Sequence, residues 1–150
     1  MAFPTLDYNL VDTNDLPGAL GGQAVQNLNL AKSLTTAMLS SGVVTAIAKM
    51  PANTRYVDLY AYATDMDSNG SPALTLHLGI AGVSDTTYDD NDAFLNASTI
   101  GQAATGTETI LKAGMGLLVP VEHYVTVTCG TSAATAVAGT LTVGLSVVLP

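Results

Sequence analysis

The sequence predicts an all-β protein, an antiparallel β-sandwich of jelly-roll or Greek-key type that follows an N-terminal extended arm. Apolar and polar residues alternate along several stretches from residue 43 onward, which is the pattern of strands with one buried face. Turn-forming residues separate these stretches, and no stretch of helical period rivals them. With 150 residues and only 11% of them charged, the chain predicts one domain that has few of the residues favoured on helix surfaces.

The arm is expected at residues 1–33 and the β-sandwich domain at 34–150. The arm contains Pro4, Pro17 and the stretch PGALGG, and its hydrophobic periodicity is weak. A short helix or a strand fits the sequence QAVQNLNLAKSL at 23–34. Two interpretations stay open: the arm packs on its own domain, or it lies on a neighbouring subunit.

Seven or eight short strands are expected in the domain. The clearest alternation gives strands at 43–50, 55–64, 73–80, 121–129 and 140–149, and the stretch 107–120 adds one or two more. In the strand at 55–64, alternation places Tyr56, Tyr60 and Tyr62 on one face. Because tyrosine is enriched at protein interfaces, this stripe is covered either by the chain's own arm and loops or by a partner.

Residues 81–106 are expected to form a loop, with a single helical turn at DAFLNA, 92–97, capped by Asp92. The loop carries four clustered aspartates, Asp85, Asp89, Asp90 and Asp92. Clustered carboxylates can bind calcium, but a charge run of this kind is more often a solvated loop tip. We therefore expect a solvated loop.

The C-terminal part of the chain is unusually neutral. From His123 to Pro150 there is no Asp, Glu, Lys or Arg. Neutral strands with a free edge invite stacking onto other chains. These strands are therefore expected to lie in the middle of a sheet or to be covered by a neighbouring subunit.

The stretch DMDSNG at 65–70 is the one that most resembles a metal site. Asp65, Asp67, Asn69 and Gly70 have the spacing that opens a calcium loop of the EF-hand type. The twelfth position of such a loop, where a bidentate Glu is required, is Leu76 in the next strand. We therefore favour a polar turn of a β-hairpin, since the dipeptide Asn-Gly is a strong turn former.

The remaining reactive side chains predict no shared site. Alternation turns His77 outward and places His123 in the apolar row of its strand, while Glu122 points to the opposite face. Cys129 lies in the same apolar row as His123 and is expected to behave as a small hydrophobe. No nucleophile elbow, phosphate-binding glycine loop or zinc spacing occurs. We predict no catalytic, cofactor-binding or metal-binding residues.

Charge excludes several classes of partner. The net charge is −8, with 4 basic against 12 acidic residues, so neither nucleic acid nor an anionic membrane surface is an expected partner. The single cysteine forms no internal disulfide, and neither a signal peptide nor a membrane-spanning run is expected. We expect a soluble protein that is synthesised in a cytoplasm.

The order of several segments resembles the capsid decoration, or cement, proteins of tailed bacteriophages. The matching segments are AKMPANTRYVDLYAYA, LTLHLGIAG, the acidic YDDNDAFLNAS, a VTVT strand and AGTLTVGLSVVL. They extend over residues 43–150. The resemblance implies a β-sandwich on the outer surface of the virion capsid, commonly a homotrimer, that bridges subunits of the major capsid protein. It supplies no catalytic residues and no cofactor.

The resemblance leads to a non-enzymatic structural role in which the arm and the tyrosine face make the contacts. The candidate interface residues are Tyr56, Tyr60 and Tyr62 together with Phe3, Leu6 and Tyr8 of the arm. An alternative of another class is a host-surface or glycan-binding β-sandwich module of a fibre or adhesin. The absence of tryptophan, the usual sugar platform, argues against this alternative.

Overall fold

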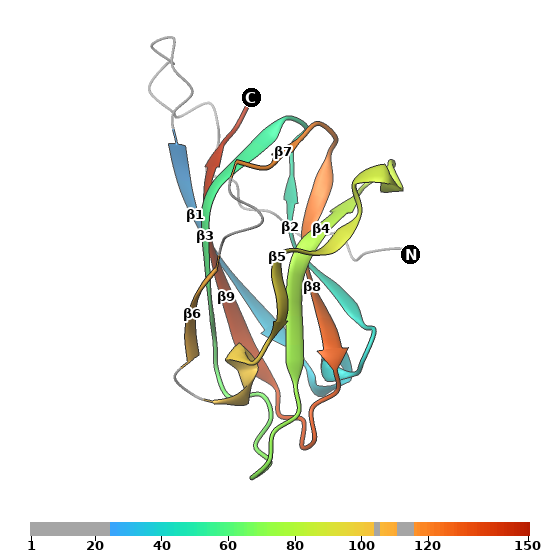
Figure 1. The fold of residues 1–150 in the computed structure, drawn as a ribbon, viewed down its shortest axis with the longest axis vertical. Coiled ribbons are helices and arrows are strands. Elements are labelled where there is room, and N and C mark those ends of the chain that lie inside the picture. The colour runs from blue at the N-terminus through green and yellow to red at the C-terminus, as the bar shows by residue number, and fades with distance from the viewer. Residues whose placement is uncertain (1–24, 104–105, 111–115) are drawn as a thin grey trace.

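A computed structural model describes residues 25–103, 106–110 and 116–150, which form two antiparallel β-sheets packed face to face (Figure 1). Sheet A has the strand order β1 (Val25–Leu34), β9 (Gly139–Val148), β3 (Thr54–Ala63) and β6 (Gly106–Ile110), with β7 (Leu118–Val119) also paired to β3. Sheet B has the order β2 (Val44–Met50), β8 (His123–Thr131), β4 (Thr75–Gly82) and β5 (Asp90–Ser98). Three short 3₁₀ turns complete the described elements: η2 (Thr36–Leu39), η3 (Thr86–Tyr88) and η4 (Ile100–Gln102).

The chain follows a jelly-roll path. Strand β1 pairs with β9, β2 with β8, β3 with β6, and β4 with β5, all antiparallel. The first four strands therefore pair with later strands in reverse order, as in one long hairpin rolled into two sheets. The predicted β-sandwich of jelly-roll type is confirmed. No helix in the described part of the chain is long and apolar enough to cross a membrane.

The core lies between the sheets and follows the predicted alternation in β4, β8 and β9. Their inward residues are Leu76, Leu78, Ile80, Val125, Val127, Cys129, Leu141, Val143, Leu145 and Val147, all buried. Each buried side chain of this size stabilises the fold by roughly 1.5–3 kcal/mol. The opposite faces of the two sheets remain for solvent or for partners.

The neutral strands of the C-terminal part both lie inside a sheet. Strand β8 lies between β2 and β4, and β9 lies between β1 and β3. Their backbone groups are therefore paired on both sides, which removes the free edges that would invite stacking. The prediction that this neutral segment lies in the middle of a sheet is confirmed.

The edge beside β9 is closed by β1, which uses part of the predicted arm. For residues 23–34 the sequence left a short helix or a strand open, and residues 25–34 form a strand. This strand packs on its own domain by pairing with β9. Residues 1–24 of the predicted arm, with Phe3, Leu6 and Tyr8, lie outside the described residues.

Strand β3 departs from simple alternation at a β-bulge between Tyr56 and Asp58. A bulge adds one residue to one strand, so side chains on its two sides change face relative to a regular strand. Tyr60 and Tyr62 are exposed, whereas Tyr56 is buried. The prediction that all three tyrosines share one face is therefore wrong for Tyr56.

Two further expectations about local structure are wrong. The predicted helical turn at 92–97 is part of β5, so Asp92 lies within a strand and caps no helix. The pairing of β5 with β4 is irregular, with register shifts on both sides of Leu78, and this erases the period-two pattern that marks a strand. The stretch 65–74 is no hairpin, because β3 belongs to sheet A and β4 to sheet B; it crosses between the sheets.

Candidate functional sites and the exposed face of sheet A

Asp67 in the DMDSNG stretch is a buried structural cap. Its carboxylate accepts backbone N–H groups from Ala73 and Leu74 at 2.7 and 3.0 Å, and from Ala134 and Thr135 at 2.9 and 2.8 Å. Burial by itself raises the pKa of Asp67, but the four donors together outweigh it and hold the pKa well below its ordinary value. Asp67 thus fastens the crossover after β3 to the loop between β8 and β9.

The rest of this stretch also forms local turns. Asp65 accepts the N–H of Asp67, and the Asn69 side chain accepts the N–H of Ser71 at 2.9 Å. These are Asx-type turns, in which a side chain replaces a backbone carbonyl. Within the described residues, no group of three or more His, Cys, Asp or Glu side chains converges as a metal site would.

Asp85, Asp89 and Asp90, three of the four clustered aspartates, each accept a backbone N–H. Asp85 accepts from Thr87 at 2.9 Å, and Asp89 accepts from Gly82 at 2.7 Å. Asp90 accepts from the backbone N–H of Asp92 at 3.2 Å. Partial loss of solvent around its carboxylate, and then the neighbouring Asp92 side chain, raise the pKa of Asp90. Asp89 and Asp90 are exposed, whereas Asp85 and Asp92 are half-buried.

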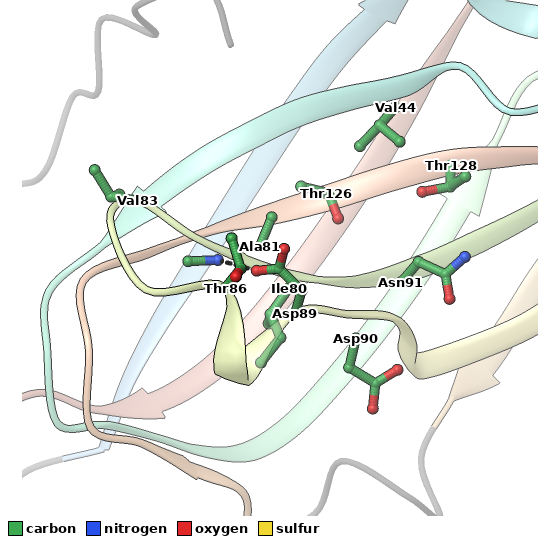
Figure 2. A pocket seen from close by; sticks show the side chains of 11 residues that line it. Val44, Ile80, Ala81, Val83, Thr86, Asp89, Asp90, Asn91, Thr126 and Thr128 are labelled. Atoms are coloured by element: carbon green, nitrogen blue, oxygen red, sulfur yellow. Dashed lines mark hydrogen bonds between the residues drawn. The ribbon is translucent and has the colours of Figure 1, made fainter. Parts of the chain in front are cut away.

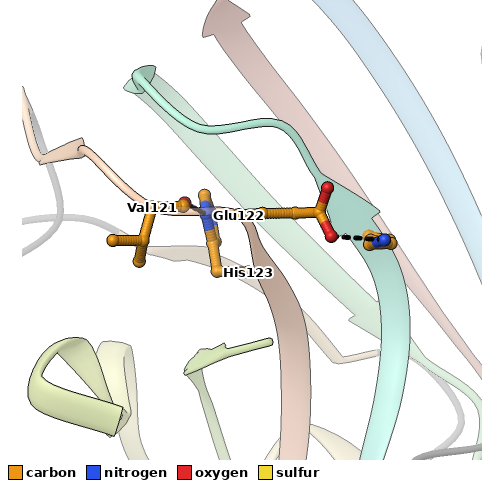
Figure 3. A network of polar contacts seen from close by, with 4 residues as sticks. Val121, Glu122 and His123 are labelled. Atoms are coloured by element: carbon orange, nitrogen blue, oxygen red, sulfur yellow. Dashed lines mark hydrogen bonds and ion pairs between the residues drawn. The ribbon is translucent and has the colours of Figure 1, made fainter. Parts of the chain in front are cut away.

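The two histidines lie in separate environments, as predicted. The ring of His77 accepts the N–H of Ala97 through Nδ1 at 3.2 Å. His123 is buried, and its Nδ1 lies 2.8 Å from the carbonyl oxygen of Val121 (Figure 3). Because a carbonyl can only accept, Nδ1 carries the proton.

The other nitrogen of His123 therefore accepts the hydroxyl of Tyr56, at 2.7 Å. The Tyr56 ring also packs against Phe94, with ring centroids 4.7 Å apart. Burial lowers the pKa of His123, so the imidazole is held neutral between its two partners. Sequence reasoning placed His123 in the apolar row but missed its partner, since the bulge that turns Tyr56 inward leaves no mark in the alternation.

The remaining polar contacts near this strand are structural. Glu122, which immediately precedes β8, forms an ion pair with Lys49 of β2, and this carboxylate raises the pKa of Lys49 (Figure 3). Cys129 is buried, and burial raises the pKa of its thiol. Since the thiolate is the reactive form, Cys129 behaves as the small core residue predicted from its position.

The outward face of sheet A carries Tyr60 and Tyr62, which are 46% and 38% exposed. Their register neighbours on β9 are Gly144 and Thr142. A Cβ atom built on Gly144 would overlap the Tyr60 ring, so this ring lies across the strand where only glycine leaves room. We call this face the tyrosine surface.

Small uncharged side chains surround the two tyrosines. The exposed residues of β1 that continue the tyrosine surface are Asn27, Asn29, Ala31 and Ser33, beside Thr140, Thr142 and Ser146 of β9. Arg55 and Asp58, toward one end of β3, are the charged exposed residues among the described side chains of this surface. The result is a pleated, nearly uncharged surface with two aromatic rings.

Comparison with solved structures identifies proteins with the same fold. The chain superposes on a chain of the cyanophage Pam1 capsid asymmetric unit with a TM-score of 0.73 and 23% identity, covering 90% of this chain and 91% of that one. A chain in the capsid of Ralstonia phage GP4 gives a TM-score of 0.73 and 22% identity, with 90% and 89% covered. No protein-family model matches the sequence, and no curated protein does. The fold resemblance to phage capsid proteins that the sequence predicted is confirmed.

Proposed function

We propose that this protein is a non-enzymatic structural component of a phage virion. In this role it is a decoration or cement protein that lies on the outer surface of the head and bridges major capsid protein subunits. The observation that carries the proposal is the match along nearly the whole length of chains from two phage capsids, at a TM-score of 0.73 in both cases.

The chemistry of the described side chains supports a structural role. Asp67 and Cys129 bond to backbone groups, and His123 bonds to the Val121 carbonyl and the Tyr56 hydroxyl. Among the described residues, these buried polar groups form no converging cluster. A net charge of −8 keeps the protein from trapping packaged DNA. Modest contacts suffice for such a role because a shell presents many copies of each contact.

We propose the tyrosine surface as a contact with the capsid or with further copies of the chain in a homotrimer. Tyr60 and Tyr62 supply large rings on a surface of small uncharged residues, and tyrosine is typical of interface residues that carry much of the binding energy. Phe3, Leu6 and Tyr8 of the arm are proposed as a second contact. Tyr56 has no place in either contact, because its side chain lies in the core.

The test is binding to capsid particles that lack this protein. The wild-type chain is expected to sediment with such particles at saturable occupancy. Replacing both Tyr60 and Tyr62 by Ser should weaken this binding by about tenfold or more. The matched control is Tyr88→Ser in η3, because Tyr88 is 39% exposed but lies on the other side of the sandwich.

Three outcomes separate the parts of the proposal. Wild-type protein that never sediments with particles contradicts the capsid role. Full occupancy by the double variant removes the tyrosine surface from the contact and leaves the role intact. Deletion of residues 1–24 tests the arm and leaves β1 intact. Sedimentation of the protein as a monomer in analytical ultracentrifugation would contradict the homotrimer.

A further inference from the structure

The outer face of sheet B contains a cavity of about 560 Å³ (Figure 2). Thr126 and Thr128 on β8 form its floor, with Val44 of β2 beside them. The segment that leads from β4 through η3 into β5 forms the opposite wall and carries Thr86, Asp89, Asp90 and Asn91 (Figure 2). The cavity lies on the opposite side of the sandwich from the tyrosine surface.

The irregular pairing of β5 produces this wall. Ile80 pairs with Asp90 and Leu78 with Leu95, so residues 91–94 have only Gly79 opposite them. A Cβ atom on Gly79 would overlap the backbone of Asp90. Glycine at this position therefore lets the start of β5 lie close against β4, which fixes the wall next to the floor.

A buried hydroxyl in the floor has no bonding partner within the described structure. Thr128 is 6% exposed, and its Oγ1 is the buried side-chain oxygen there that makes no hydrogen bond. Buried polar atoms in native proteins are nearly always bonded. Thr128 lines the cavity, but its Oγ1 has almost no exposed area, so a ligand can supply the missing donor only once this side chain rotates toward the cavity.

The lining chemistry selects the class of ligand. It contains two carboxylates, Asp89 and Asp90, and no Lys or Arg, so an anion is disfavoured. It contains no aromatic ring, so a sugar has no stacking platform. Val44, Ala81 and Val83 add an apolar part that suits an aliphatic chain rather than a bare ion.

We propose that this cavity receives a lysine side chain from a neighbouring capsid protein. The four-carbon stem lies along the apolar part, the ammonium group donates to the Thr128 hydroxyl once that side chain has rotated toward it, and the two carboxylates balance its charge. This proposal rests on the proposed capsid role and adds to it the side-chain chemistry of a second contact.

The test uses the isolated protein and two small probes, so it needs no capsid. N-acetyl-lysine N-methylamide carries the proposed side chain, and N-acetyl-norleucine N-methylamide keeps the stem without the ammonium. In nitrogen-15 NMR titrations, we expect the lysine probe to shift the amide signals of Val44, Thr126 and Thr128 saturably. The norleucine probe should bind about tenfold more weakly, because it lacks the charge-assisted hydrogen bond.

Variants then assign the effect to the cavity. Thr128→Val keeps the side-chain shape and removes the hydroxyl, and Asp90→Asn removes one charge; each should weaken lysine binding several-fold. Asp58→Asn, on the opposite sheet, is the charge-matched control and should leave binding unchanged. Since Thr128→Val removes an unpaired buried hydroxyl, its melting temperature should not fall, which shows that lost binding is not lost folding.

Equal binding of both probes, no shifts at the cavity, or equal weakening by Asp58→Asn would overturn the lysine site. Any of these results leaves the capsid role standing, because particle sedimentation tests that role separately. Conversely, wild-type protein that fails to sediment with particles removes the capsid role while a specific lysine-probe response still supports the cavity.

Discussion

Tyr56 donates its hydroxyl to His123 in the interior of the sandwich, and Tyr56→Phe tests this contact directly. The substitution keeps the ring against Phe94 and removes only the oxygen that lies 2.7 Å from His123 Nε2. Tyr56 is 1% exposed, so water cannot replace the lost donor. An unsatisfied buried group of this kind costs about 1–3 kcal/mol of unfolding free energy.

That loss is measurable in a domain of this size. At roughly 2–4 °C per kcal/mol, the melting temperature should fall by about 2–12 °C. Urea denaturation should show a lower midpoint with an unchanged m-value, because the surface exposed on unfolding stays the same. The control is Tyr60→Phe, which removes a hydroxyl from a residue 46% exposed and should change stability by less than about 0.5 kcal/mol.

A double-mutant cycle with His123→Leu isolates the pair. If the hydroxyl and the imidazole bond to each other, the double variant should be more stable than the sum of the single losses predicts, by about 0.5–3 kcal/mol. Additive losses, or a Tyr56→Phe variant as stable as Tyr60→Phe, would refute the buried contact and with it the inward turn of Tyr56 at the bulge.

Three further predictions concern stability. Asp67→Asn replaces one acceptor oxygen by an NH₂ group, which faces backbone N–H groups and cannot accept from them. The melting temperature should therefore fall by more than about 4 °C. Gly79→Ala should destabilise the fold and broaden the NMR signals of β5, whereas Gly70→Ala, whose Cβ meets open space, should not. The pKa of His123 is lower in the folded protein than in the unfolded chain, so as the pH falls the imidazole takes up its proton in the unfolded chain before it does so in the folded protein. Its contribution to stability is therefore complete above pH 6.5 and falls with pH below that value, and His123→Leu should remove this part of a urea pH series.

The sequence predicted those strands whose alternation is regular. In β4, β8 and β9 the apolar row of the sequence is the buried row of the structure, because each is an inner strand with one face on the core. The rest depended on irregularities that alternation does not record. A bulge in β3 turned Tyr56 inward, and the register shifts of β5 hid a strand within an acidic segment.

Candidate sites were less predictable than the fold for a related reason. The spacing of DMDSNG resembles a calcium loop because Asp and Asn also form turns, and only the backbone donors from residues 73–74 and 134–135 show that Asp67 is a cap. The cavity on sheet B joins β2, β8 and β5, which are distant in sequence. No local pattern marks Thr128 as the residue whose hydroxyl lacks a partner.

Cryo-electron microscopy of purified phage particles tests the proposed role most directly. We expect the jelly-roll density of this chain on the outer surface of the head, in many symmetry-related copies that each touch more than one major capsid subunit. Particles whose heads lack this density, or that carry the chain only on the tail, would contradict the role proposed for it.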